Sequence, residues 1–268
     1  MESRYTAVRS AALVRPWLAA IPLTAALTAW GEPPPREREL PLGGLRVSSP
    51  APIRRDHPVT YTMHLGDPAA LLGQLGEYHP SIAASADTVA VTVDYANAPS
   101  CGPPEARHRQ PSWVVDYDEG PVEDLAELAR ATWGEAFRGE ELAELVYGYL
   151  EPRFGSFEVA SKAARTRTGD CTEHAVLLAA LARRFGMPAR VVLGYKLLDG
   201  VDLIIGHAWV EVYRDGRWAG LDPTTGDRPV DNGYLALGVL SDEGPGFLVS
   251  TVELLAILDV ERFEVAQP

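Results

Sequence analysis

The stretch between Cys171 and Asp222 constrains the fold of this 268-residue chain more than any other part of it. It opens with apolar residues at helical spacing, which predict a helix over 171–185 closed by a glycine and a proline. Strand-like segments follow, and an Asp-Gly pair joins the last two, which is a strong signal for a two-residue hairpin turn. These segments cover 189–196, 206–213 and 217–221. The succession predicts a helix packed against antiparallel strands.

The segments on either side of this stretch repeat both kinds of pattern. Helical spacing of apolar residues predicts helices at 68–78, 121–135, 140–149 and 157–165. Alternation predicts strands at 59–65 and 87–95, and β-branched apolar residues indicate one or two more strands within 252–265. We therefore predict an α+β fold, in which helices are followed by an antiparallel sheet and preceded by a small β-rich N-terminal region.

The first 30 residues have the pattern of an export signal. Arg4, Arg9 and Arg15 precede an apolar run over 17–29, which is shorter than the ~20 residues that a membrane-spanning helix needs. We expect residues 1–30 to be a cleaved signal peptide and the protein to be exported, to the periplasm or outside the cell. An uncleaved membrane anchor and a cytoplasmic chain are the alternatives.

The rest of the chain divides by composition into three parts. Residues 31–56 are rich in proline and mixed charge, which predicts an extended linker. Residues 57–118 form the β-rich region, and residues 119–268 form the core with its C-terminal strands. A net charge of −13 and a pI near 4.9 argue against nucleic acid and anionic membrane surfaces as partners.

Cys171 is the candidate nucleophile, because it stands where a loop gives way to the long helix. An ordinary thiol, with a pKa of about 8.5, reacts as the thiolate, and the partial positive charge of a helix N-terminus favours that form. Asp170 fits the helix N-cap and Glu173 completes a capping-box spacing, although both carboxylates oppose thiolate formation. A disulfide with Cys101, the one other cysteine, would block this chemistry, and nothing local indicates that the two meet.

His207 and Asp222 are the candidate base and orienting acid. His207 lies on a predicted strand where it shares one face with Trp209, while apolar residues take the other face. The hairpin returns the next strand alongside and brings Asp222, at its end, near the imidazole. A carboxylate there orients the ring and stabilises its charged form. The backbone N–H of Cys171 is a natural oxyanion donor, and the indole of Trp133 is a candidate for the second.

Four segments of the chain resemble the bacterial transglutaminase-like core. They are Gly-Asp-Cys-Thr-Glu-His-Ala at 169–175, Leu-Ala-Arg-Arg-Phe-Gly-Met-Pro-Ala-Arg-Val-Val-Leu-Gly-Tyr at 181–195, Gly-His-Ala-Trp-Val-Glu-Val-Tyr at 206–213 and Gly-Arg-Trp-Ala-Gly-Leu-Asp-Pro-Thr at 216–224. The resemblance covers about residues 120–226. It implies a papain-like α+β core with Cys171 as nucleophile, His207 as base and Asp222 as orienting acid, and it leaves residues 31–118 without a motif.

The resemblance implies thiol-dependent acyl transfer on peptide or protein amide bonds through a thioester. Resolution of the thioester by water makes a peptidase or amidase, and resolution by an amine makes a crosslinking transglutaminase. The sequence leaves this choice open, as it does the oligomeric state. We expect a peptide or protein substrate, with cell-envelope material as a candidate, and neither a cofactor nor a bound metal.

Two other readings of the same residues stay open. A non-catalytic module could keep this fold to bind peptide or cell-envelope material. A zinc site could combine Cys171 and His174, which share a helix face, with His207 and Asp222. The other histidines have no partner pattern and are expected on the surface or in linkers; they are His57, His64, His79 and His108.

Overall fold

The computed structural model describes residues 44–240 and 260–268, apart from short gaps at 50–51, 67, 80, 98–101, 119, 135–136, 156, 199 and 227–228. Its helices are α2 (Ala69–Tyr78), α3 (Gly120–Trp133), α4 (Gly139–Tyr149), α5 (Ala160–Thr166), α6 (Cys171–Arg184) and a one-turn 3-10 helix, η1 (Ala106–Arg109). Its strands are β1 (Leu45–Ser48), β2 (Val59–Leu65), β3 (Ile82–Ala84), β4 (Thr88–Val93), β5 (Glu151–Pro152), β6 (Thr168–Gly169), β7 (Ala189–Leu197), β8 (Leu203–Arg214), β9 (Arg217–Leu221), β10 (Tyr234–Val239) and β11 (Val260–Ala266).

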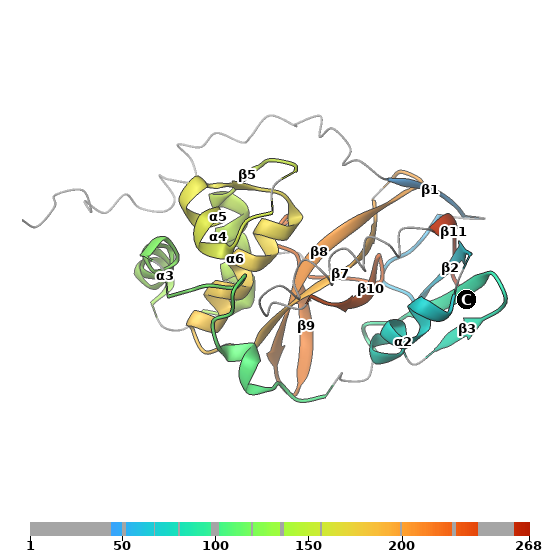
Figure 1. Ribbon diagram of the computed structural model, residues 1–268, viewed down its shortest axis with the longest axis horizontal. Coiled ribbons are helices and arrows are strands. Elements are labelled where there is room, and N and C mark those ends of the chain that lie inside the picture. The colour runs from blue at the N-terminus through green and yellow to red at the C-terminus, as the bar shows by residue number, and fades with distance from the viewer. Residues whose placement is uncertain are drawn as a thin grey trace, which may run out of the picture. The chain divides into compact units, whose positions relative to one another are not determined.

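Nine of the described strands form a single sheet, in the order β10-β7-β8-β1-β11-β2-β4-β3, with β9 paired to β8. All pairs in it are antiparallel except β1 with β11, which is parallel. Figure 1 shows α3 to α6 gathered beside one end of the sheet and α2 beside the other. The fold is α+β, as the sequence predicts, although the parallel pair and β10 are not anticipated.

The α6 helix forms the centre of the helical core. Every residue from Glu173 to Arg183 is buried, so the helix is enclosed on all sides by α3, α4, α5 and the sheet. Apolar residues of β7 and β8, among them Val191, Val210 and Val212, pack in the same cluster. Burying apolar surface away from water stabilises a fold by about 25 cal/mol per Å². This packing is therefore the main force that holds the start of α6 in place.

The N-terminal strands continue the same sheet and enclose a second apolar cluster. In β2 the residues alternate between full and partial burial, and Tyr61 and Met63 pack in this cluster with Phe263 of β11. Strand β1 lies inside the segment expected to be a linker. Val47 of β1 is buried in this cluster, so residues 45–48 gain apolar contacts as well as strand hydrogen bonds and form part of the sheet.

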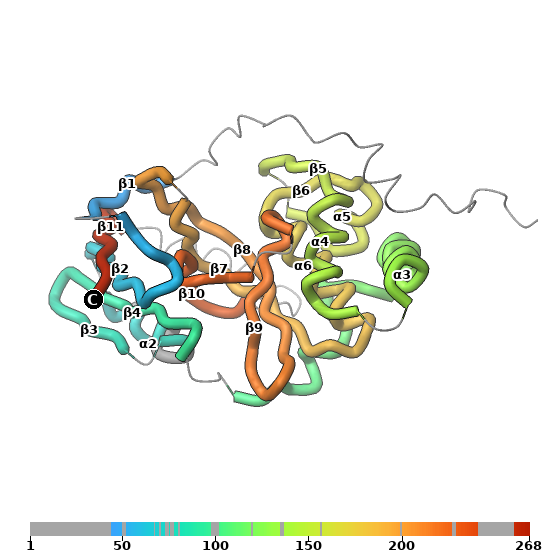
Figure 2. Tube along the Cα trace, turned by 180° about the vertical axis from the view of Figure 1, so that it is seen from behind, coloured from blue at the N-terminus to red at the C-terminus, as the bar shows by residue number. Residues whose placement is uncertain are grey.

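The hairpin between β8 and β9 determines which face of the sheet Asp222 reaches. Asp215 and Gly216 both have positive φ, 51° and 79°, as a two-residue turn of the predicted kind requires. Its register pairs Leu221 with Val210, so Asp222 follows on the opposite face, which is the face of His207. Figure 2 shows β8 and β9 side by side from behind.

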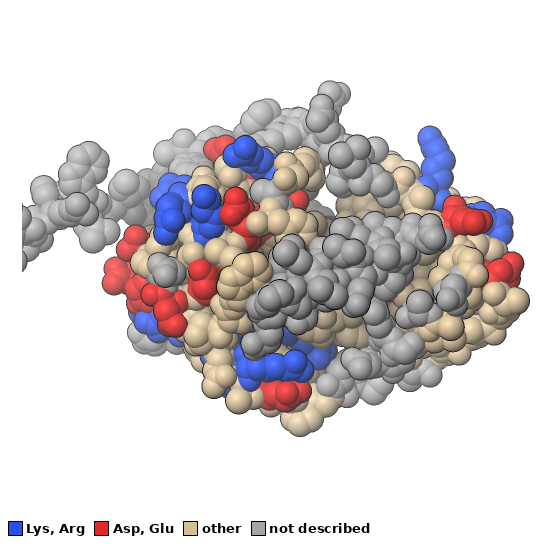
Figure 3. Space-filling view, in the orientation of Figure 1, with Lys and Arg blue, Asp and Glu red and all other residues tan. Residues whose placement is uncertain are grey.

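All described residues belong to one of the two units into which the chain divides, residues 39–268. Among the helices that the structure describes, none combines the length and apolarity needed to cross a membrane. The expected signal peptide, residues 1–30, and the first part of the strand region predicted at 252–265 lie outside the described residues. Basic and acidic side chains are interspersed over the helical part of the face shown in Figure 3.

Candidate active site

Cys171 is the first residue of α6 and is half-buried. The Asp170 side chain accepts hydrogen bonds from the backbone N–H groups of Thr172, at 2.9 Å, and of Glu173, while Glu173 bonds back to the Asp170 N–H at 2.8 Å. The capping box predicted from the sequence is therefore complete. Two of the N–H groups in the first turn are used by this cap, and the Cys171 N–H remains the candidate oxyanion donor.

Glu173 is fully buried directly behind the candidate nucleophile. Its second oxygen accepts a hydrogen bond from the Glu158 N–H at 2.9 Å, which ties the loop before α5 to the start of α6. Gly169 must lack a side chain here, because a Cβ would lie 2.2 Å from the Cβ of Glu173. Burial, followed by the charge of Asp170, raises the pKa of Glu173 to about 7. Near neutral pH Glu173 therefore opposes formation of the Cys171 thiolate less than a fully ionised carboxylate would.

Replacing Glu173 with glutamine is expected to change how stability depends on pH. Because the pKa in the folded state, about 7, exceeds the ordinary value of 4.5, protonated Glu173 stabilises the fold at low pH. That contribution is complete below pH 4.5 and is lost as pH rises through 7. Over this pH interval the free energy of unfolding of wild type should fall by on the order of 2 kcal/mol relative to that of Glu173→Gln. Chemical denaturation of both proteins between pH 4.5 and 8 measures it, and parallel curves would contradict it.

His207 and Asp222 form a direct hydrogen bond, with 2.9 Å between Nε2 and the Oδ2 carboxylate oxygen. The Cys171 thiol lies close enough to the His207 ring to raise the pKa of the imidazole. Since Nε2 faces Asp222, Nδ1 is the ring nitrogen left for Cys171. All three sequence-predicted site residues thus come together, although they lie on α6, on β8 and just after β9.

The environment of His207 favours the imidazolium form. Burial opposes the charge, but the negative charge and hydrogen bond of Asp222, together with the contact to Cys171, outweigh it and raise the pKa of His207 to about 9. The ring also lies near the indole of Trp209, at 6.4 Å between centroids and an interplanar angle of 21°. Opposite His207 on β7 stands Gly194, where a Cβ would lie 2.1 Å from the carbonyl oxygen of Leu235. Any larger residue would force β7 and β10 apart.

Asp222 has no exposed surface and accepts five hydrogen bonds. Its Oδ1 oxygen receives the backbone N–H and the hydroxyl of Thr224, at 2.9 and 2.7 Å. Its Oδ2 oxygen receives His207, the Lys196 ammonium at 2.7 Å and the Tyr234 hydroxyl at 2.7 Å. Although burial works against the charge of Asp222, His207 and then Lys196 hold its pKa well below the ordinary value. The carboxylate is therefore ionised and fixed in orientation.

Lys196 and Tyr234 are the site residues that sequence reasoning misses. Lys196 ends a predicted strand, and a lysine directly after the uncharged run 191–195 was the available signal for it. Tyr234 belongs to β10, where no strand is predicted. The two residues pair directly across β7 and β10, so only the long-range register brings them to Asp222.

The alternative metal site has little support in the geometry. His174 directs Nδ1 at the Asp170 carbonyl oxygen, 2.6 Å away. In the part of the chain that the structure describes, no three His, Cys, Asp or Glu side chains are grouped as metal ligands. Trp133, the candidate for a second oxyanion donor, packs beside Phe137 against the helical core, as an ordinary core aromatic does.

Two of the other histidines are not surface residues, contrary to the prediction. His79 is buried, and its Nε2 lies 2.9 Å from the carbonyl oxygen of Ala236 in β10. His108 is buried against the edge of Trp218 and accepts the Glu105 N–H at Nδ1. Burial lowers the pKa of both, to about 4 for His108. They are structural, neutral imidazoles, and the partners that bury them, Ala236 in β10 and Trp218 in β9, lie too far along the chain for a local pattern to reveal.

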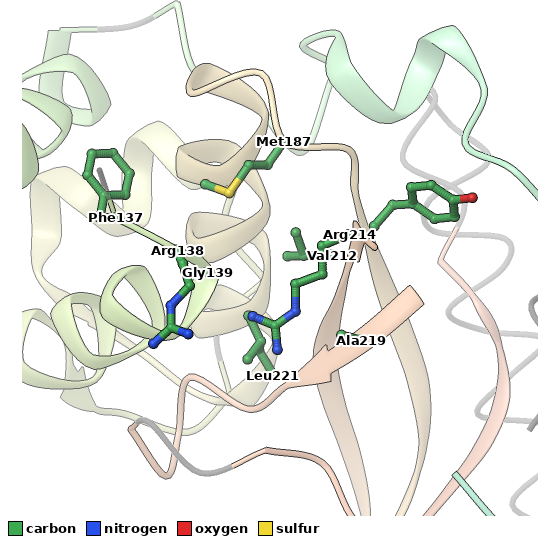
Figure 4. A pocket seen from close by; sticks show the side chains of 9 residues that line it. Phe137, Arg138, Gly139, Met187, Val212, Arg214, Ala219 and Leu221 are labelled. Carbon is green, nitrogen blue, oxygen red and sulfur yellow. The ribbon is translucent and has the colours of Figure 1, made fainter. Parts of the chain in front are cut away.

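A cavity of about 120 Å³ lies between the start of α4 and strands β8 and β9 (Figure 4). Its lining is mainly apolar, with Met187, Val212 and Leu221, and Arg214 at its edge is paired with Glu140. Leu221 directly precedes Asp222, but none of the three candidate site residues lines the cavity. It is a separate feature on the other face of β9.

Comparison with known proteins identifies the core that carries this site. Residues 140–223 match the transglutaminase-like superfamily, and this span contains Cys171, His207 and Asp222. No curated protein matches the chain. Among solved structures, it is similar to a candidate cysteine protease from Cytophaga hutchinsonii, with 17% identity, a TM-score of 0.43, and coverage of 84% of this chain and 83% of the other.

Two further structures are similar over about half of the chain. One is the periplasmic domain of TgpA from Pseudomonas aeruginosa, with 22% identity, a TM-score of 0.35, and coverage of 51% of this chain and 53% of the other. The other is described as a TGase, with 17% identity, a TM-score of 0.31, and coverage of 54% and 43%.

Proposed function

We propose that this chain, which carries a transglutaminase-like core over residues 140–223, catalyses acyl transfer on peptide or protein amide bonds through a thioester at Cys171. The observation that carries the proposal is the grouping of three residues: His207 is hydrogen-bonded to the buried carboxylate of Asp222 and lies close enough to Cys171 for the thiol to raise its pKa. A purely structural cysteine has no need of an imidazolium whose orientation is fixed by a buried carboxylate.

The proposed reaction has two steps. In the first, the Cys171 thiolate attacks the amide carbon, the C–S bond forms, the C–N bond breaks, and His207 gives its proton to the leaving amine. In the second, water or an acceptor amine attacks the thioester while neutral His207 takes a proton from it. The C–S bond then breaks and restores the thiolate–imidazolium pair. Asp222 keeps its charge throughout and holds the ring in place.

Whether water or an amine resolves the thioester is part of the proposal to be tested. Hydrolysis makes the protein a peptidase or amidase, and transfer to an amine makes it a crosslinking enzyme. The export pattern of residues 1–30 supports a substrate outside the cytoplasm, such as peptide or protein of the cell envelope.

Alkylation by iodoacetamide at pH 6 tests the nucleophile directly. At this pH an ordinary thiol is almost wholly protonated, so fast labelling requires a stabilised thiolate. We expect Cys171 to react about 10²-fold faster in wild type than in His207→Ala. Mass mapping distinguishes Cys171 from Cys101, which serves as the reference thiol in the same chain, and His64→Ala is the control for loss of a remote histidine.

Equal labelling of Cys171 in wild type and His207→Ala would contradict the proposal. That result would favour the alternative of a non-catalytic binding module.

A further inference from the structure

Lys196 is an unexpected neighbour for a His–Asp pair. The sequence has only two lysines, Lys162 and Lys196, among 24 lysines and arginines. Lys162 is exposed on α5, whereas the Lys196 side chain is only 12% exposed. Its ammonium lies 2.7 Å from Asp222 and 5.0 Å from the centroid of the Tyr234 ring.

Stability alone gives a weak reason for a lysine at this position. Burying an ammonium has a large desolvation penalty, and well-packed apolar side chains often replace buried ion pairs without loss of stability. Asp222 already has a cationic partner in His207, and Thr224 and Tyr234 donate the other hydrogen bonds that it needs. The second positive charge therefore calls for a different explanation.

The ammonium binds the same carboxylate oxygen as the imidazole. Lys196 Nζ and His207 Nε2 lie 2.7 and 2.9 Å from Oδ2 of Asp222, so the two positive groups are less than ~6 Å apart. At this separation the ammonium repels the imidazolium and also takes up part of the charge of Asp222. Both effects make it easier for His207 to release a proton.

The other groups around His207 do not supply this effect. Cys171 faces it from α6 and Asp222 from the end of β9, and both favour the imidazolium. Tyr234 faces it from β10, and because burial and then the charge of Asp222 raise the pKa of this phenol, it stays neutral. On the strand of His207 itself, Glu211 is paired with Arg190. Asp170 and Glu173, behind Cys171, are negative when ionised.

We propose that Lys196 is a positioning residue that offsets the charge of Asp222 and so keeps His207 able to give its proton to the leaving amine. The inference rests on the proposed function. With the thiolate, imidazolium, carboxylate and ammonium all present, the buried site carries two negative and two positive charges. Without Lys196 it carries a net negative charge, and the imidazolium holds its proton more tightly.

Replacing Lys196 with methionine tests the inference through the titration of the His207 ring, followed by NMR in the full-length protein. Removing a nearby positive charge favours the charged ring, so the titration midpoint should move up by about one pH unit. Lys196→Gln, whose amide can still donate a hydrogen bond, should show the same shift. Lys196→Arg, which keeps the charge, and Lys162→Met, which removes the exposed lysine, should titrate like wild type.

The same change should appear in turnover of a labelled casein. The alkaline limb of kcat/KM should move up with the ring titration, and kcat/KM at neutral pH should fall about tenfold because proton donation to the leaving amine becomes harder. A merely structural lysine would alter stability and leave both pH profiles in place.

Unchanged or lower titration midpoints in Lys196→Met and Lys196→Gln would overturn the inference. Failure of the proposed function looks different: Cys171 of wild type would then label no faster than Cys101. The titration of the His207 ring measures the effect of Lys196 whether or not Cys171 acts as the nucleophile.

Discussion

Cys171→Ala is expected to abolish acyl transfer while leaving the fold intact. Loss of the nucleophile removes the thioester route altogether, so turnover should fall by at least about 10⁴-fold. Alanine suits the first turn of a helix, and the half-buried thiol contributes little packing, so Tm should change by less than about 2 °C. The fall should appear both in hydrolysis of labelled casein and in incorporation of a fluorescent amine into it.

The second cysteine provides a matched control for this prediction. Cys101→Ala removes a thiol with no proposed role and should keep wild-type turnover. If Cys171→Ala retained more than about a tenth of the activity, the nucleophile would have to be another residue. The ratio of the two products in wild type would also show whether water or an amine resolves the thioester.

Asp222→Asn is expected to reduce both activity and stability. An amide cannot stabilise the imidazolium as a carboxylate does, so turnover should fall by about 10³- to 10⁴-fold. The free energy of unfolding should fall by about 3–5 kcal/mol, because the buried Lys196 ammonium loses its counter-charge. Urea denaturation and casein turnover measure the two effects separately.

A double variant separates the two roles of Asp222. Adding Lys196→Met to Asp222→Asn removes the uncompensated ammonium and should recover most of the lost stability. It should recover none of the turnover, because the base still lacks its orienting carboxylate. A double variant no more stable than Asp222→Asn would show that the ion pair with Lys196 is not what Asp222 contributes to the fold.

Local patterns were enough to predict the elements that carry the candidate site. The apolar stripe of α6, the capping residues around Cys171 and the Asp-Gly turn each depend on residues close in sequence. Once α6 and the hairpin are predicted, the alternation of a strand also predicts the face on which His207 lies. The candidate triad could therefore be named before any tertiary contact was known.

The surroundings of Asp222 could not be predicted in this way. Lys196 and Tyr234 reach the carboxylate only through the pairing of β7 with β10, and β10 lies beyond a loop whose path has no local signal. His79 is buried for the same reason, since its partner is the carbonyl of Ala236, 157 residues away. Strand β1 was missed because four residues beside a proline-rich segment form a strand only when other strands pair with them, and here β8 and β11 do so.

The position of β11 in the sheet has a consequence for the order of events during synthesis. This strand lies between β1 and β2, and its pairing of Val260 with Leu65 joins residues 195 positions apart. Strands β2 and β4 can form an early hairpin, but they reach β8 only through β1 and β11. Such high contact order slows folding and leaves strand edges exposed while the chain is unfinished. The hairpin of β2 and β4 can therefore join the rest of the sheet only after residues 260–266 have been made.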